Sequence, residues 1–163
     1  MTRIKIVLTC VLLVTIAFFS GAQDSGLGAG IILGEPTGIT VKLWLSGSSA
    51  IDLSAGWAFA STSNETVPVA ETEFRVQLNA DYLYHFLRPF TVPEGMTAIH
   101  CGIGGTVKLM PDMVVTGVRV PAGIAYYVEP APLEIFLEIA LVMELFPATA
   151  GTFNSALGLR WFF

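Results

Sequence analysis

Apolar and polar residues alternate along most of this chain. From Leu133 to Leu145 every second residue is a large apolar one, and the residues between them include Glu134, Glu138 and Glu144. A period of two places alternate residues on opposite faces of a β-strand. Read as a helix, the same segment would scatter its three glutamates around the helix axis. The alternation therefore predicts a long β-strand with one apolar face and one polar face.

Eight segments show this alternation, and residues typical of turns separate them. Pro, Gly, Asp and Ser occur in the gaps, as in Glu35–Gly38 and Glu129–Pro132, and they supply the backbone geometry that turns need. Several segments reach about ten residues, which is long for a globular strand and sufficient for a tilted strand to cross a bilayer. The predicted strands cover residues 25–34, 39–46, 50–60, 73–87, 96–109, 114–128, 133–146 and 152–163.

The two faces of these strands differ sharply in composition. One face carries aliphatic and aromatic residues: Leu53, Trp57, Phe59, Val76, Leu78, Tyr82, Tyr84, Ile99, Ile103, Val118, Val120 and Ile124. The other face is rich in glycine and carries Asp52, Arg75, Gln77, Asn79, Asp81, His85, His100, Lys108, Arg119 and Arg160. A glycine-rich polar face suits a cramped interior, whereas a solvated face would carry more Lys and Glu. In a bilayer, only a closed barrel satisfies every backbone group of a protein built from strands. We therefore predict an all-β, eight-stranded antiparallel up-and-down transmembrane barrel, apolar toward lipid and polar toward the lumen.

Composition supports this interpretation. Of the 163 residues, 53% are hydrophobic and 13% are charged, whereas about 25% are charged in an ordinary soluble domain. Mean hydropathy is +0.69, which also excludes a disordered chain. Eight Lys and Arg stand against thirteen Asp and Glu, with no basic stretch after the first few residues. This balance argues against nucleic-acid binding.

Residues 1–22 have the layout of a secretory signal peptide. Arg3 and Lys5 precede an apolar run over Ile6–Phe19, and the small residues Ser20-Gly21-Ala22 follow. The run is short for a membrane-spanning helix, which needs about 20 apolar residues, so an uncleaved anchor is the weaker alternative. We expect cleavage after Ala22, which leaves residues 23–163 as one barrel domain.

The C-terminal segment ends in an outward aromatic residue. Leu157, Leu159, Trp161 and Phe163 share one face, and this row resembles the assembly signal of bacterial outer-membrane barrels. With the N-terminal segment, the chain resembles small outer-membrane proteins of the OmpA/OmpX type. It also resembles uncharacterised families described as "outer membrane protein beta-barrel domain", on the segments Gly34–Gly38, Asp81–Phe86, Gly117–Pro121 and Phe136–Ile139. The resemblance implies a bacterial outer-membrane location and insertion by the barrel-insertion machinery, and it implies no established activity.

The inward charges are the first candidate site. Eight strands enclose an interior just wide enough for side chains, so the cations there must meet carboxylates. The expected charge network contains Lys42, Arg75, Lys108, Arg119 and Arg160 with Asp52, Glu73, Asp81, Glu134, Glu138 and Glu144. We expect Arg119 and Glu138 to pair across the ladder, since their strands are joined by the turn at 129–132. A rigid salt-bridged plug is the favoured interpretation, and a proton or ion path is the alternative.

Other candidates have simpler interpretations. His85, Asp81 and His100 face inward and could in principle bind a metal. His85 lies at one end of its strand and His100 nearer the middle of the next, so we expect packing and no metal or cofactor. The outward row has no histidine, which argues against a lipid-modifying hydrolase.

Two features of the outer wall and the ladder are also predicted. Pro121 cannot donate to a ladder, so we expect a local bulge there. An interfacial aromatic girdle is predicted from Tyr82, Tyr84, Phe86, Tyr126 and Trp161, with a carbohydrate-stacking platform as the alternative.

These patterns favour a non-catalytic, monomeric outer-membrane barrel with a structural or surface-interaction role. An extracellular partner would contact the acidic loop 61–72, through Glu65, Glu71 and the adjoining Glu73. The alternative is a narrow transport or small-ligand-binding barrel that uses the inward charges.

Overall fold

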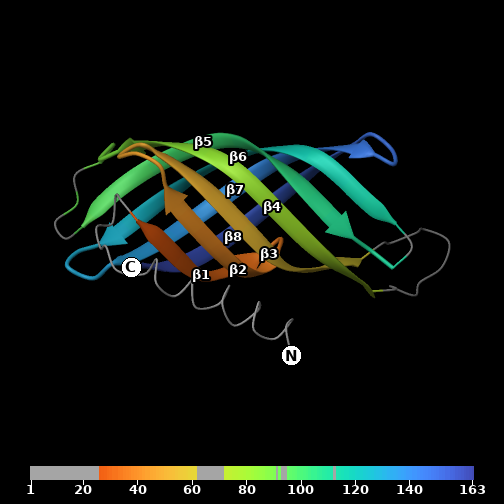
Figure 1. Cartoon of the computed structure of the whole chain (residues 1–163), viewed down its shortest axis with the longest axis horizontal. Helices are drawn as coiled ribbons and strands as arrows, with labels where there is room; N and C mark the ends of the chain where they lie inside the picture. Colours follow the sequence, from red (N-terminus) through yellow and green to blue (C-terminus); the bar gives the residue numbers. More distant parts are fainter. Residues whose placement is uncertain (1–25, 62–71, 91, 93–94, 112) are drawn as a thin grey trace, which may run out of the picture.

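The computed structural model describes residues 26–61, 72–90, 92, 95–111 and 113–163. Its strands are β1 (Leu27–Gly34), β2 (Thr37–Trp44), β3 (Ser49–Ser61), β4 (Thr72–Leu87), β5 (Met96–Leu109), β6 (Val114–Val128), β7 (Leu133–Phe146) and β8 (Ala150–Phe162). Each strand pairs with the next and β8 pairs with β1, so the sheet closes (Figure 1). The predicted eight-stranded antiparallel barrel is confirmed, with strand bounds within about two residues of those expected. The predicted signal peptide and most of loop 61–72 lie outside the described residues.

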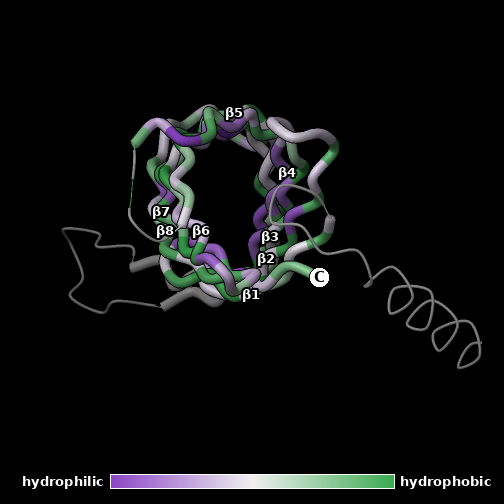
Figure 2. The backbone as a smooth tube through the Cα atoms, turned by 90° about the vertical axis from the view of Figure 1, so that its left-hand side faces the viewer, coloured by the Kyte–Doolittle hydropathy of each residue, from purple (hydrophilic) through white to green (hydrophobic). Residues whose placement is uncertain are grey.

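Closure places all strands around one axis, and the strands run obliquely to the long axis of the barrel (Figures 1 and 2). The β1–β8 ladder extends from Gly28↔Phe162 to Gly34↔Ala156, so neither terminal strand is left as an open edge. β1 begins and β8 ends at the same end of the barrel, which we call the terminal rim. The strand ends at this rim are Leu27, Trp44, Ser49, Leu87, Met96, Val128, Leu133 and Phe162. Within the described residues, no helix is long and apolar enough to cross a membrane.

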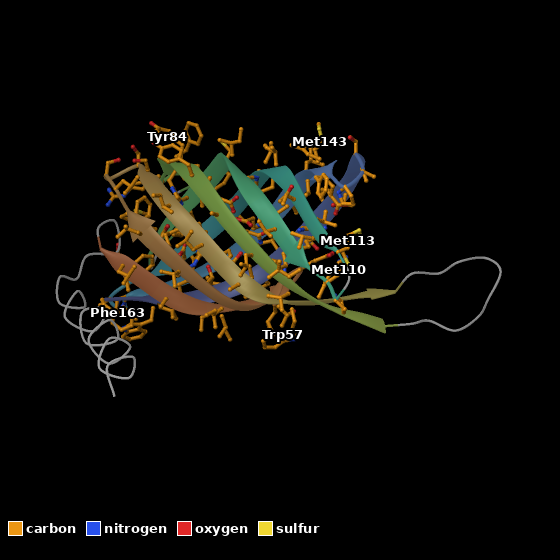
Figure 3. The ribbon with its side chains drawn as sticks, turned by 45° about the vertical axis from the view of Figure 1, so that its right-hand side comes forward. Trp57, Tyr84, Met110, Met113, Met143 and Phe163 are labelled. Atoms are coloured by element: carbon orange, nitrogen blue, oxygen red, sulfur yellow. The ribbon has the colours of Figure 1, made fainter. Side chains whose placement is uncertain are left out.

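Burial alternates along the strands in the predicted sense. In β7, Glu134 and Glu138 are buried, whereas Leu137 and Leu141 are 51% and 64% exposed. Figure 3 shows Trp57, Tyr84 and Met143 projecting away from the wall. A soluble barrel buries its aliphatic residues and exposes its charges. This barrel does the opposite around most of its circumference.

An apolar cluster lies inside the barrel at the terminal rim. Phe136 and Ile32 extend the cluster further from the rim, and its large members at the rim are Trp44, Met96, Tyr127 and Phe162, each at most 9% exposed. The ring centroids of Trp44 and Tyr127 are 6.5 Å apart, and those of Tyr127 and Phe162 are 6.2 Å apart. We call these four side chains the terminal plug. The lumen therefore has an apolar layer at the terminal rim and polar layers between this layer and the opposite rim.

Gly158 shows why the lumen face needs glycine. It lies opposite Phe136 in the β7–β8 ladder, and a Cβ at Gly158 would lie 2.1 Å from Phe136 Cζ. The absent side chain lets the Phe136 ring lie over the neighbouring strand. The Arg160 guanidinium lies 3.8 Å from the centroid of that ring, which is a cation–π arrangement.

The bulge expected at Pro121 is wrong. The β5–β6 ladder keeps one register on both sides of Pro121, from Cys101↔Ala122 to Gly104↔Arg119, and only the pairs between them are missing. Pro121 still lies opposite Ala140 in the β6–β7 ladder, and the register shift of that ladder falls between Thr116 and Gly117. Because proline has no N–H, the β5–β6 ladder is interrupted at Pro121, but β6 gains no extra residue there and so forms no bulge.

Replacing Gly158 tests the packing of the lumen. Gly158→Ala should lower the free energy of unfolding by about 1–3 kcal/mol, because the new methyl group overlaps the Phe136 ring. Gly151→Ala is the matched control, since a Cβ there would have nothing within 4 Å. Urea unfolding in detergent micelles, followed by tryptophan fluorescence, measures both. Equal effects of the two substitutions would contradict this account of the lumen.

Candidate functional site

Ion pairs cross the lumen next to the terminal plug. Arg160 of β8 donates from Nη2 to Thr40 Oγ1 of β2 at 2.7 Å and from Nη1 to Glu134 Oε2 of β7 at 3.1 Å. Its Nη2 also forms a salt bridge with Asp52 of β3. The Arg160 side chain is 2% exposed. One guanidinium therefore links four strands across the interior.

Glu134 is the second centre of this cluster. Its Oε1 accepts from Lys42 Nζ at 2.5 Å and from the Tyr127 hydroxyl at 3.1 Å. The side chains of Lys42 and Glu134 are completely buried. Each carboxylate oxygen of Glu134 thus faces a cation, Oε1 the Lys42 ammonium and Oε2 the Arg160 guanidinium. This is the arrangement that makes a buried charge tolerable, since an unpaired one costs far more.

A second cluster surrounds Arg119 of β6. Its Nη2 donates to Glu138 Oε1 at 2.6 Å, and its Nε lies 3.4 Å from Asp81 Oδ1. The register differs from the expected one, because Glu138 lies opposite Gly123 and Arg119 lies opposite Val142. The pair is therefore diagonal. Arg119 lies four residues along β6 from Gly123, the residue opposite Glu138, and the long arginine side chain spans this offset.

Two further ion pairs lie toward the opposite rim. Lys108 Nζ lies 2.6 Å from Glu144 Oε1, and Arg75 pairs with Glu35. Sequence reasoning left Glu35 in a turn, and it proposed Glu73, whose side chain is outside the described set. It also missed Thr40 and Tyr127 as partners. Their positions carried a usable signal. Thr40 is two residues from Lys42 and so shares its inward face, and Tyr127 is adjacent to the outward Tyr126 and so faces inward.

The two histidines lie side by side, contrary to the expectation from their sequence positions. His85 lies directly opposite His100 in the β4–β5 ladder, and their ring centroids are 5.3 Å apart. Lys42 Nζ lies 3.1 Å from His85 Nε2, and His100 Nε2 lies 3.6 Å from Glu138 Oε2. In the described part of the chain, no group of three or more His, Cys, Asp or Glu side chains is arranged to hold a metal ion. The neighbouring ammonium group makes the pair a poor cation site.

The outer wall carries the predicted aromatic residues and the C-terminal row. Tyr82, Tyr84, Phe86 and Trp161 are 45–54% exposed, whereas Tyr126 is half-buried. The C-terminal row is exposed at every position, with Leu157 at 51%, Leu159 at 41%, Trp161 at 47% and Phe163 at 37%. Phe163 lies at the opposite end of the barrel from Met110 and Met113 (Figure 3). The chain therefore ends at the terminal rim with this row facing outward.

Comparison with solved structures finds a similar β-barrel. The crystal structure of the N-terminal β-barrel domain of Pseudomonas aeruginosa OprF is similar to this chain, with a TM-score of 0.54 and 16% sequence identity. The similarity covers 84% of this chain and 95% of that one. At this identity the likeness shows the fold, which is the OmpA-type barrel expected from the sequence. No protein-family model matches the chain, and no curated protein matches it.

A double-mutant cycle tests the diagonal pair. Arg119→Ala should destabilise the barrel by about 3–5 kcal/mol, because it leaves Glu138 and Asp81 buried without their cation. Glu138→Ala should also destabilise it, and the double variant should lose less than the two single losses combined. Urea unfolding in micelles gives the three free energies. Additive effects would show that the two side chains do not interact.

Proposed function

We propose that this chain is a non-catalytic barrel of a bacterial outer membrane with a structural or surface-interaction role. The observation that carries the proposal is the inverted polarity of the wall. Aliphatic residues such as Ile103 and Leu141 are 60% and 64% exposed, whereas Lys42 and Arg160 are fully enclosed. Lipid solvates such an outer surface, and water does not. The fold shared with the OprF barrel domain supports the same environment.

A closed lumen favours a structural role over transport. Arg160, Glu134 and Lys42 bridge the interior near the terminal rim, where Glu134 accepts from Tyr127 of the terminal plug. An ion crossing the barrel would have to break several buried salt bridges and then pass an apolar layer. Breaking one such pair costs about 3–5 kcal/mol. The alternative of a narrow transport barrel requires this whole column of side chains to rearrange.

The surface role would use the end opposite the terminal rim. There β3 and β4 extend beyond both neighbours, since their pairing continues to Ser61↔Thr72 while β2 begins opposite Trp57 and β5 ends opposite Val76. This ribbon protrudes from the barrel (Figure 3). With both termini in the periplasm, the ribbon ends at Ser61 and Thr72 on the extracellular side, and we propose loop 61–72 as the segment that contacts an extracellular partner.

Delivery and insertion complete the proposal. Residues 1–22 would direct export and be removed, and the mature barrel would act as a monomer. The outward row Leu157, Leu159, Trp161 and Phe163 would be read by the insertion machinery as an added β-strand with alternate side chains.

Planar-bilayer recording distinguishes the two roles. The folded protein, identified by a mobility shift between boiled and unboiled gel samples, should give no reproducible open state. A Glu134→Ser/Arg160→Ser variant that still shows the gel shift should pass more current, because it removes the central bridge and keeps the net charge of the lumen unchanged. Lys42 and Asp52, which lose these partners, lie opposite each other in the β2–β3 ladder. A reproducible wild-type open state would favour the transport alternative. Unchanged gel mobility, or recovery in the soluble periplasmic fraction, would contradict the membrane location.

A further inference from the structure

Arg88 differs from the other Lys and Arg residues of the described chain in its exposure and in its position at the terminal rim. Lys42, Arg75, Lys108, Arg119 and Arg160 each pair with a carboxylate of the barrel. Arg88 is exposed and directly follows β4 at the terminal rim. Given the outer-membrane location proposed above, this rim lies in the periplasmic leaflet. We propose that Arg88 binds the phosphate of an anionic phosphoglycerolipid in that leaflet.

The backbone at Arg88 indicates that the side chain matters there. Its φ is 58°, and it is the one non-glycine residue with a positive φ in the part of the chain that the structure describes. Its N–H donates to Thr97 O at 2.7 Å, which closes the connection between β4 and β5. Gly or Asn would take this left-handed conformation at lower cost. An arginine in this position keeps a strained conformation that the turn alone does not require.

The outer wall beside Arg88 is suited to a lipid. Tyr82, Tyr84 and Phe86 follow one another on the outer face of β4, with 49%, 45% and 54% exposure, and Phe90 beyond them is 56% exposed. The Tyr84 and Phe86 rings meet edge to face with centroids 5.1 Å apart. Aromatic side chains of this kind lie at the level of the headgroups. Arg88 lies two residues beyond Phe86, where the chain leaves β4 at the terminal rim, so it follows directly on the row of rings that marks the headgroup level.

The charge of the Arg88 guanidinium favours an anionic lipid over a zwitterionic one. The neighbouring β2–β3 turn, Leu45-Ser46-Gly47-Ser48, has no charged residue, and its Ser48 carbonyl already accepts from His85 N–H in β4 at 2.7 Å. A guanidinium can donate two parallel hydrogen bonds to one phosphate. The attraction of one such residue to an anionic leaflet corresponds to about a fivefold enrichment of the lipid.

Spin-labelled lipids measure this selectivity directly. The barrel is folded into phosphatidylcholine vesicles that contain spin-labelled phosphatidylglycerol or spin-labelled phosphatidylcholine, and the motionally restricted fraction is read by electron paramagnetic resonance. Wild-type protein should prefer phosphatidylglycerol, and Arg88→Asn should reduce that preference about fivefold. Asn fits the left-handed backbone, so this variant should fold normally. Arg88→Lys should keep part of the preference, because it retains the charge and loses the paired geometry.

The controls separate this inference from the proposed function. Glu129→Gln changes another exposed charge at the same rim and should leave the preference nearly unchanged. High salt should weaken the wild-type preference if Arg88 acts through its charge. Equal preference in wild type and Arg88→Asn, with both folded by the gel-shift criterion, would overturn the Arg88 site alone. Failure of the wild-type chain to fold into vesicles would overturn the membrane location instead.

Discussion

Pairing of β1 with β8 is the constraint on which the rest of the structure depends. It satisfies the backbone groups of both terminal strands from Gly28↔Phe162 to Gly34↔Ala156. In hydrocarbon each unpaired backbone group would cost several kcal/mol, whereas burying one outward side chain contributes about 1.5–3 kcal/mol. An open edge would therefore outweigh the contacts of many side chains. Closure comes first, and the two faces of the sheet must adapt to it.

A barrel closed by eight strands has little room inside, and this determines the chemistry of the lumen. Long cationic side chains fit only where they cross to a carboxylate on another strand, as Arg160 does to Asp52 and Glu134. Glycine is needed where a side chain lies over the backbone of the neighbouring strand, as the Phe136 ring of β7 lies over Gly158 of β8. The same ion pairs that make the charges tolerable also link strands far apart in sequence. Rigidity and closure of the lumen are thus consequences of one packing problem.

The strands and their faces could be predicted because a period of two is a local property. Leu133–Leu145 specifies both a strand and its outward face without knowledge of any partner. Partners across the lumen depend on register and strand tilt, which are properties of the whole barrel. That is why Arg119 meets Glu138 diagonally, why Glu35 in a turn reaches Arg75, and why His85 and His100 lie opposite one another. At Pro121 the local rule was applied too strongly, since a ladder can lose pairs without gaining a bulge.

The central claim is that the apolar outer face contacts lipid, and the depth dependence of a single charge tests it most directly. Ile139 lies at the middle of β7 and Leu145 lies near its end, with similar exposures of 47% and 52%. In phospholipid vesicles, urea unfolding should show that Ile139→Arg costs about 2–4 kcal/mol and Leu145→Arg about 0–1 kcal/mol. Equal and small losses at the two positions would show that water, and not lipid, covers this face.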